Sequence, residues 1–163
     1  MNSIRIGIGY DVHPFERGRD LILGGLRIDY TYGLGGHSDA DVLVHAIIDA
    51  ICGAAGFGDI GKLFPDTNDM YKNIRSIILL QKVCTMLKDS AAEIINIDSV
   101  VICEKPKILP YVDEMKKMIS EALDNLPVDR IGIKGKTTEG LGFTGRSEGI
   151  AVQAVALLRI GPE

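Results

Sequence analysis

The sequence of 163 residues has little of several features that would each point to a particular class of protein. Its three cysteines, Cys52, Cys84 and Cys103, are odd in number and widely spaced, which suits neither a disulfide framework nor a CxxC zinc motif. With 18 basic and 22 acidic residues and no basic run, the chain is expected to bind neither nucleic acid nor an anionic membrane. It also lacks an apolar run of ~20 residues and the hydrophobic region of a signal peptide, so we expect a soluble, cytoplasmic protein.

The residues that are present predict a folded domain of α+β class. Hydrophobic residues make up 46% of the chain, enough for one domain, residues 1–163, to bury roughly two-thirds of its unfolded surface. Apolar periodicity predicts strands at 4–13, 94–104, 130–136 and 148–160, and helices at 38–55, 74–88 and 110–123. Residues 148–160 also fit an Ala-rich helix, but their continuous apolar character favours a strand buried on both faces.

The paired glycines Gly24 and Gly25 separate two short apolar runs, which predicts a small β-hairpin. The expected fold is therefore a mixed β-sheet with helices packed on one face and a small β-hairpin that projects from it.

Asp11 and His13 are the first candidates for metal ligands. They fall on one face of the first predicted strand, because strand side chains alternate with a period of two. His37 and His45 are the other histidines, and either one would complete a three-ligand site. Zinc binds imidazole nitrogen and carboxylate oxygen, and three protein ligands leave its fourth position open for water or substrate. With one aspartate and two neutral histidines such a site has a net charge of +1, which favours an anionic oxygen there.

The helix that carries His45 is predicted to begin at Ser38, which with Asp41 three residues later resembles a capping box. Asp41, His45 and Asp49 are spaced four residues apart on it and are expected to share a face. A lone histidine on an amphipathic helix is more often structural, but the two acidic neighbours and the strand pair favour His45 as a ligand.

Two glycine-rich loops are further candidates for substrate binding. Residues 56–67 fit either a turn between helices or a loop that offers N–H groups to phosphates and carboxylates to hydroxyls or a cation. Residues 134–146 place hydroxyls, glycines and cations around Glu139. Lysine and arginine suit phosphate oxygens, and a glutamate suits a divalent ion held partly by those phosphates, so this loop favours diphosphate binding over a solvated charged surface.

Four motifs together resemble the 2-C-methyl-D-erythritol 2,4-cyclodiphosphate synthase family: Asp11-Val12-His13, His37-Ser38-Asp39-Ala40-Asp41 with His45, Gly58 to Asp66, and Thr137 to Arg146. They cover nearly the whole chain in the family's order. The resemblance implies a phosphorus-oxygen lyase of the non-mevalonate isoprenoid pathway. Its reaction converts 4-diphosphocytidyl-2-C-methyl-D-erythritol 2-phosphate to the 2,4-cyclodiphosphate and releases CMP, by metal-assisted intramolecular phosphoryl transfer.

The resemblance also implies a role for each matching residue. Zinc would be held by Asp11, His13 and His45, and a second divalent ion, Mg²⁺ or Mn²⁺, by Glu139 at the substrate diphosphate. His37 and Thr138 are the expected catalytic residues. The remaining substrate-binding residues are Ser38 at a phosphate, Asp59, Ile60, Gly61, Phe64, Pro65 and Asp66 at the erythritol, Cys103, Lys105, Pro106, Lys107 and Leu109 at the cytosine, and Thr137 at the diphosphate.

The family forms homotrimers with active sites shared between subunits, so the resemblance implies that one chain holds an incomplete site. Phe143 and Arg146 match positions near its central threefold cavity. Two other functions fit the residues themselves. One is a metal-dependent phosphohydrolase that uses zinc-bound water, and the other is a catalytically silent oligomer that binds metal and nucleotide.

Overall fold

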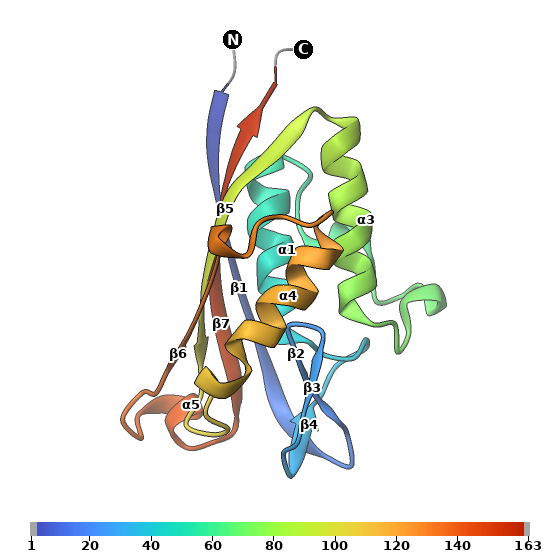
Figure 1. Cartoon of the computed structure of the whole chain (residues 1–163). Coiled ribbons are helices and arrows are strands. Elements are labelled where there is room, and N and C mark those ends of the chain that lie inside the picture. Colours follow the sequence, from blue (N-terminus) through green and yellow to red (C-terminus); the bar gives the residue numbers. More distant parts are fainter. Residues whose placement is uncertain (1–2, 162–163) are drawn as a thin grey trace.

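The computed structural model describes residues 3–161, which form a five-stranded mixed sheet with helices on one face (Figure 1). The strand order is β4-β1-β7-β5-β6, in which only β5 and β6 run parallel. The strands are β1 (Ser3–Arg17), β4 (Tyr32–Leu34), β5 (Ala92–Ile102), β6 (Ile131–Lys136) and β7 (Gly149–Ile160). The predicted strand at residues 148–160 is thus confirmed, and it lies in the middle of the sheet. The expected burial on both faces is not seen in the single chain, because Gln153 and Arg159 lie exposed on the face that no helix covers.

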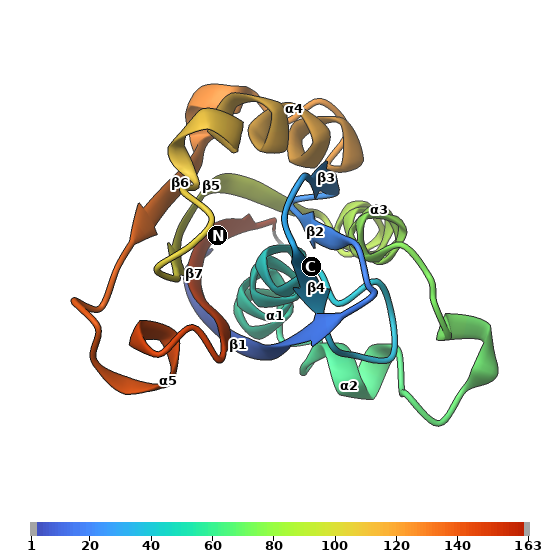
Figure 2. The same cartoon turned by 90° about the horizontal axis from the view of Figure 1, so that it is seen from below.

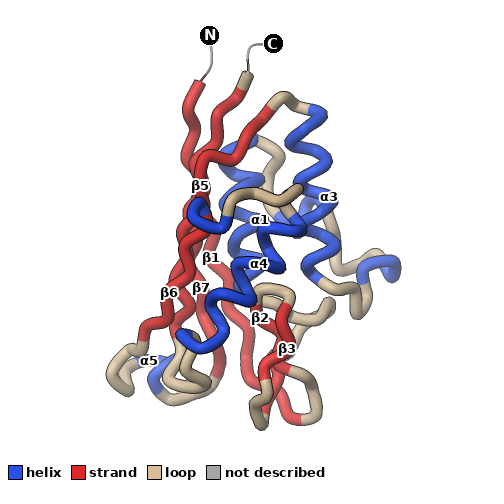
Figure 3. The backbone as a smooth tube through the Cα atoms, in the orientation of Figure 1, coloured by secondary structure: helices blue, strands red, loops and turns tan. Residues whose placement is uncertain are grey.

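Three helices cover one face of this sheet, as the separation of helices and strands in Figure 3 shows. They are α1 (Val42–Ala55), α3 (Ser76–Asp89) and α4 (Val112–Ala122). Helix α1 packs on β1 and β7, and α3 covers its other side, so nearly every side chain of α1 is buried. This arrangement confirms the predicted α+β class. Among the described residues, no helix combines the length and the apolar character needed to cross a bilayer.

Short elements complete the fold. They are the helices α2 (Ile60–Leu63) and α5 (Gly142–Gly145), and the 3-10 turns η1 (Asp69–Tyr71), η2 (Leu109–Tyr111) and η3 (Val128–Arg130). Helix α2 lies within the glycine-rich loop at residues 56–67, and α5 follows the loop that carries Glu139. In the view of Figure 2 these two short helices lie at different sides of the molecule.

The predicted hairpin is present as β2 (Leu21–Leu23) and β3 (Leu26–Ile28). Gly24 and Gly25 form its turn with φ values of 59° and 77°, which glycine adopts without strain. The hairpin packs against the helices instead of projecting into solvent, because Met115 and Ile77 contact the turn and the side chains of Leu21, Leu23 and Ile28 are at most 2% exposed.

Strand β1 divides its residues between two faces as the period of two predicts. Gly7 and Gly9 face α1 so closely that a Cβ at Gly9 would lie 1.9 Å from the carbonyl oxygen of Ala46. The opposite face carries Ile4, Ile6, Ile8 and Tyr10, which are 57–72% exposed. The two glycines therefore bring the backbones of β1 and α1 together, and the larger apolar side chains lie on the uncovered face of the sheet.

The predicted start of the first long helix is wrong by four residues. Helix α1 begins at Val42, and Asp41 is its N-cap, with a carboxylate that accepts the N–H of Val44 at 3.1 Å. Ser38 lies before the helix, where Ala40 with φ 56° turns the chain, and its hydroxyl contacts His45 instead of capping. Asp41 consequently points to the hairpin turn, so it does not share a functional face with His45 and Asp49 as the spacing suggested.

Candidate metal centre and substrate pockets

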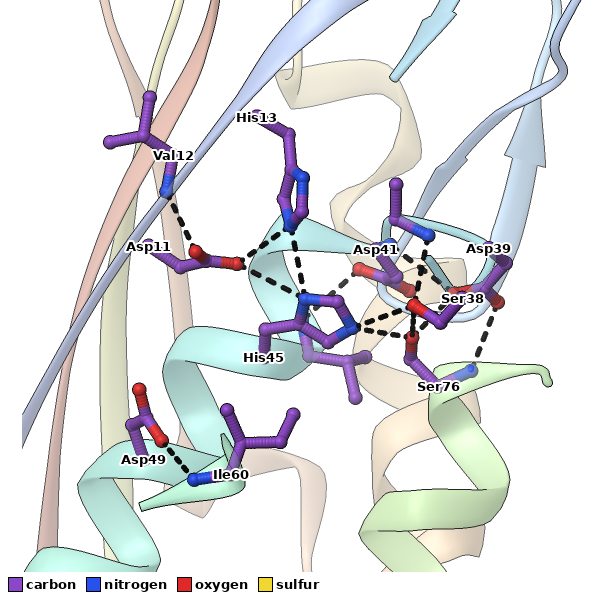
Figure 4. A network of polar contacts seen from close by, with 12 residues as sticks. Asp11, Val12, His13, Ser38, Asp39, Asp41, His45, Asp49, Ile60 and Ser76 are labelled. Carbon is purple, nitrogen blue, oxygen red and sulfur yellow. Dashed lines mark hydrogen bonds and ion pairs between the residues drawn. The ribbon is translucent and has the colours of Figure 1, made fainter. Parts of the chain in front are cut away.

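Asp11 and His13 of β1 and His45 of α1 converge on one point (Figure 4). The Oδ2 atom of Asp11 lies 3.0 Å from His13 Nε2 and 3.1 Å from His45 Nδ1, and the two imidazole nitrogens are 3.2 Å apart. The close packing of β1 on α1 makes this convergence possible, since the strand and the helix each bring their ligands to the same gap. His37 is exposed and does not belong to the cluster.

In each of the two histidines, the ring nitrogen that faces away from Asp11 has a hydrogen-bond partner that orients the ring. His13 Nδ1 lies 2.6 Å from the carbonyl oxygen of Gly35, which can only accept, so Nδ1 carries the proton and Nε2 presents a lone pair. His45 Nε2 lies 2.8 Å from Ser76 Oγ, on the side of the ring away from Asp11. With the proton on Nε2, His45 Nδ1 also presents a lone pair. Three electron-rich atoms then face one another with no proton between them, an arrangement that a cation stabilises.

The cluster fits zinc. A tetrahedral Zn²⁺ with bonds of about 2.0–2.1 Å separates its ligand atoms by roughly 3.3 Å, close to the three separations of 3.0–3.2 Å here. The carboxylate is also in the ionised form that a metal requires. Burial opposes ionisation, but without a metal the hydrogen bonds and positive charge of protonated His13 and His45 outweigh it and hold the pKa of Asp11 below its usual range. A metal ion that replaces those imidazole protons supplies the same positive charge beside the carboxylate. The predicted group of Asp11, His13 and His45 is therefore suited to hold a metal ion.

A cavity of about 350 Å³ opens beside these three residues. Its wall includes six of the residues predicted to bind substrate, which are His37, Ser38, Ile60, Gly61, Phe64 and Asp66. Helix α2 is fixed there from two sides, because Asp59 caps it through the N–H of Lys62 and Asp49 accepts the N–H of Ile60 at 2.8 Å. The loop at residues 56–67 is thus a helix-to-helix connection that also forms a wall of the metal pocket.

A second cavity, of about 450 Å³, lies between β6 and α4. Its lining contains five predicted residues, which are Cys103, Pro106, Lys107, Leu109 and Thr137. Strands β7 and β5 separate β1 from β6, so the strands that border the two cavities are about 14 Å apart at a strand spacing of ~4.8 Å (Figure 2). The metal cluster lies beside the smaller cavity. Within one chain, the predicted residues of the metal pocket and those of the second cavity therefore lie apart.

The loop that follows β6 is held by a carboxylate that the sequence did not reveal as important. Glu104 Oε1 accepts the N–H groups of Thr138 at 3.0 Å and Gly140 at 3.3 Å. Between these anchors Glu139 adopts a φ of 54°, and its carboxylate accepts the hydroxyl of Thr137 at 3.1 Å. In the part of the chain that the structure describes, Glu139 belongs to no cluster of three potential ligands. A metal bound there needs oxygen atoms from outside this loop.

Several predicted residues line neither cavity. Phe143 lies in α5 and Arg146 at its end, where Arg146 Nε donates to Glu148 Oε1 at 2.7 Å on the surface. Lys105 and Pro65 are next to lining residues of the two cavities without lining them. Sequence reasoning missed Gly35 and Ser76, and it did not predict that Asp49 holds the start of α2, because all three act through contacts between residues far apart in the chain.

Comparison with known proteins agrees with this geometry. The YgbB family matches residues 4–159 of the chain. This chain belongs to that family. A 2-C-methyl-D-erythritol 2,4-cyclodiphosphate synthase of Clostridium acetobutylicum is 57% identical over 155 residues, which are 95% of this chain and 99% of that protein. The resemblance seen in the four motifs is thereby confirmed.

Solved structures show the same fold. The bifunctional IspDF of Campylobacter jejuni matches with a TM-score of 0.94 and 44% identity, over 99% of this chain and 43% of that longer chain. The IspF–CDP complex of Plasmodium falciparum matches with a TM-score of 0.86 and 36% identity over 99% of both chains.

Proposed function

We propose that this chain is a cytoplasmic 2-C-methyl-D-erythritol 2,4-cyclodiphosphate synthase. It converts 4-diphosphocytidyl-2-C-methyl-D-erythritol 2-phosphate to the cyclic diphosphate and releases CMP. The observation that carries the proposal is the three-ligand cluster of Asp11, His13 and His45, open on one side to a cavity lined by the predicted phosphate and erythritol residues. The relatives named for this activity and the CDP complex of a structural neighbour support it.

The chemistry requires positioning more than proton transfer. The attacking phosphate has a second pKa of about 6 and is largely anionic at pH 7, so no general base is needed. The leaving group is also a phosphate. Catalysis then consists of aligning two anions and stabilising the charge of the transferred phosphoryl group. Asp11, His13 and His45 would hold a zinc ion, which would supply a Lewis acid for a phosphate oxygen.

The two cavities bind different parts of the substrate. In the metal pocket His37 and Ser38 contact the phosphate, and Asp59, next to the lining residue Ile60, contacts the erythritol hydroxyls. In the second cavity the segment from Cys103 to Leu109 holds the cytosine, and Thr137, with Thr138 next to it, contacts the diphosphate. Glu139 holds the second divalent ion, Mg²⁺ or Mn²⁺, with the diphosphate supplying the additional oxygen ligands that the loop lacks.

A complete site then requires a second copy of the chain, and we expect a homotrimer. The separation of the two cavities by β7 and β5 and the exposed row of Ile4, Ile6, Ile8 and Tyr10 on the uncovered sheet face both support assembly. Light scattering is expected to give three times the chain mass of 17.6 kDa. Ile6→Lys, at a side chain that is 72% exposed, is expected to lower that mass and turnover together. A wild-type protein that turns over as a single chain would contradict the shared site.

Glu139→Gln is expected to lower the apparent affinity for Mg²⁺ or Mn²⁺ by about 10-fold, so that turnover requires a higher concentration of the second metal. The reason is that the variant removes a charge from the second metal site and leaves the zinc ligands unchanged. The measurement is turnover against Mg²⁺ concentration, with zinc content determined on the same samples. Glu121→Gln, at an exposed position of α4, serves as the matched control. Normal metal dependence in Glu139→Gln would show that the loop at residues 137–146 does not bind the metal.

The function itself is tested by incubating the purified protein with the substrate, Zn²⁺ and Mg²⁺ and analysing the products by phosphorus NMR. We expect cyclic diphosphate and CMP. A linear product would instead indicate the alternative, a phosphohydrolase that uses zinc-bound water as the nucleophile. Unchanged substrate would indicate an oligomer that binds metal and nucleotide without catalysis.

A further inference from the structure

A row of polar groups lies behind His45, on the side away from Asp11 and His13 (Figure 4). Ser76, the first residue of α3, is fully buried, and its Oγ lies 2.8 Å from His45 Nε2. The same hydroxyl donates to the carboxylate of Asp39. The carboxylate also accepts the backbone N–H of Ser76 at 3.0 Å, so Asp39 holds both polar groups of this serine. The row therefore runs from Asp39 through Ser76 to the ring of His45.

The hydrogen-bonding capacity of these groups determines the position of each proton. An ionised carboxylate can only accept, so the single hydroxyl proton of Ser76 points to Asp39. The oxygen of Ser76 then faces His45 with its lone pairs and accepts a hydrogen bond from the Nε2–H group. A histidine with its proton on Nε2 has its lone pair on Nδ1, and this is the atom that lies 3.1 Å from Asp11 and 3.2 Å from His13.

We propose that Asp39 and Ser76 position His45 as a metal ligand by fixing its tautomer and the rotation of its ring. Ser76 is thus a positioning residue that touches neither metal nor substrate. His13 has a simpler counterpart in the carbonyl of Gly35. Partners of this kind raise the basicity of a ligating histidine, and their loss typically lowers metal affinity by 10–100-fold. The inference rests on the proposed metal site and adds residues to it that none of the four motifs assigns to the metal.

Ser38 also has a hydroxyl near His45 Nε2 and can be compared with Ser76. Its hydroxyl lies 3.1 Å from His45 Nε2 and 3.3 Å from Ser76 Oγ, but within residues 3–161 it makes no hydrogen bond to a carboxylate. It accepts the backbone N–H of Ala40 at 3.2 Å. Ser38 is consequently free to donate its proton toward either neighbour, and it does not impose one tautomer on His45. Removal of its hydroxyl is expected to affect the metal less than removal of the hydroxyl of Ser76.

The test measures Zn²⁺ affinity of the full chain by competition with a chromophoric chelator. Ser76→Ala is expected to weaken zinc binding by about 10–100-fold, whereas Ser76→Thr, which keeps the hydroxyl, is expected to bind nearly as the wild type does. Ser38→Ala is expected to lose less affinity than Ser76→Ala. Wild-type affinity in Ser76→Ala, or an equal loss in Ser38→Ala, would overturn the proposal. A wild-type protein that fails to bind zinc would instead refute the metal site on which the proposed function rests.

Because Ser76 also begins α3, unfolding is followed for each variant by circular dichroism. Nitrogen-15 NMR of the histidine rings in the wild-type protein gives a result that needs no variant. The proposal predicts that in the zinc-loaded protein the Nε2 proton of His45 is held in a hydrogen bond to Ser76 and exchanges slowly with solvent. An Nε2 proton that exchanges rapidly in the zinc-loaded wild-type protein would overturn it even if Ser76→Ala does not fold.

Discussion

His45→Ala is expected to abolish stoichiometric zinc binding and to reduce turnover by roughly 10³-fold, the consequence of losing several kcal/mol of charge stabilisation. The variant leaves Asp11 and His13 as a two-ligand pair, and two protein ligands do not make the three-ligand zinc site found in catalytic centres. Zinc content per chain is measured by atomic spectroscopy after gel filtration, and turnover by phosphorus NMR.

His37→Ala is the matched control for zinc binding. His37 lines the same cavity but is exposed and lies outside the ligand cluster, so its removal is expected to leave the zinc content at one per chain. Its proposed contact with the phosphate predicts that turnover still falls in this control. Wild-type zinc content in His45→Ala, or loss of zinc in His37→Ala, would show that the third ligand is assigned to the wrong histidine.

Asp41→Ala is expected to have the largest effect on stability, a loss of about 3–5 kcal/mol in the free energy of unfolding. Asp41 is fully buried and accepts three backbone N–H groups, those of Gly24 at 2.9 Å, Gly25 at 2.6 Å and Val44 at 3.1 Å. Alanine would leave these donors without a partner at the turn of the hairpin and at the first turn of α1. Urea unfolding followed by circular dichroism measures the loss.

Two variants control this prediction. Asp59→Ala removes the N-cap of α2, which accepts a single exposed N–H, and is expected to cost only about 1 kcal/mol. Asp41→Asn keeps an acceptor without the charge. Burial, with a smaller contribution from Asp39, raises the pKa of Asp41 to about 6, so we expect asparagine to cost less than alanine. A loss in Asp41→Ala no greater than in Asp59→Ala would contradict the role of Asp41 in joining the hairpin to α1.

Local pattern was sufficient to predict most of the elements. The period of two in β1 put Asp11 and His13 on one face together with Gly7 and Gly9, and the structure confirms that division. Continuous apolar character at residues 148–160 distinguished a central strand from a helix. The start of α1 was harder to predict, because Ser38 and Asp41 are both good capping residues and the choice depends on what else each side chain can bind.

Contacts over long sequence separations were not visible in the sequence. Ser76 lies 31 positions from His45, and Glu104 lies 34 positions from the N–H of Thr138 that it accepts. The projecting hairpin was an incorrect expectation for the same reason, since the residues that cover its turn come from α3 and α4. Hydrophobic periodicity indicates which face of an element is buried, but it does not identify the element that packs against that face.

Residue types at short, fixed spacings were enough to predict the fold class, the family and the candidate ligands. They could not show that β1 and α1 approach closely enough to bring Asp11, His13 and His45 together, or that Asp39 and Ser76 lie behind the third ligand. Only the tertiary structure decided both points, and it also decided that the two cavities lie on either side of β7 and β5. The physical reason is that metal ligation and hydrogen bonding depend on distances of about 2–3 Å between atoms, which packing of distant segments sets and local sequence does not.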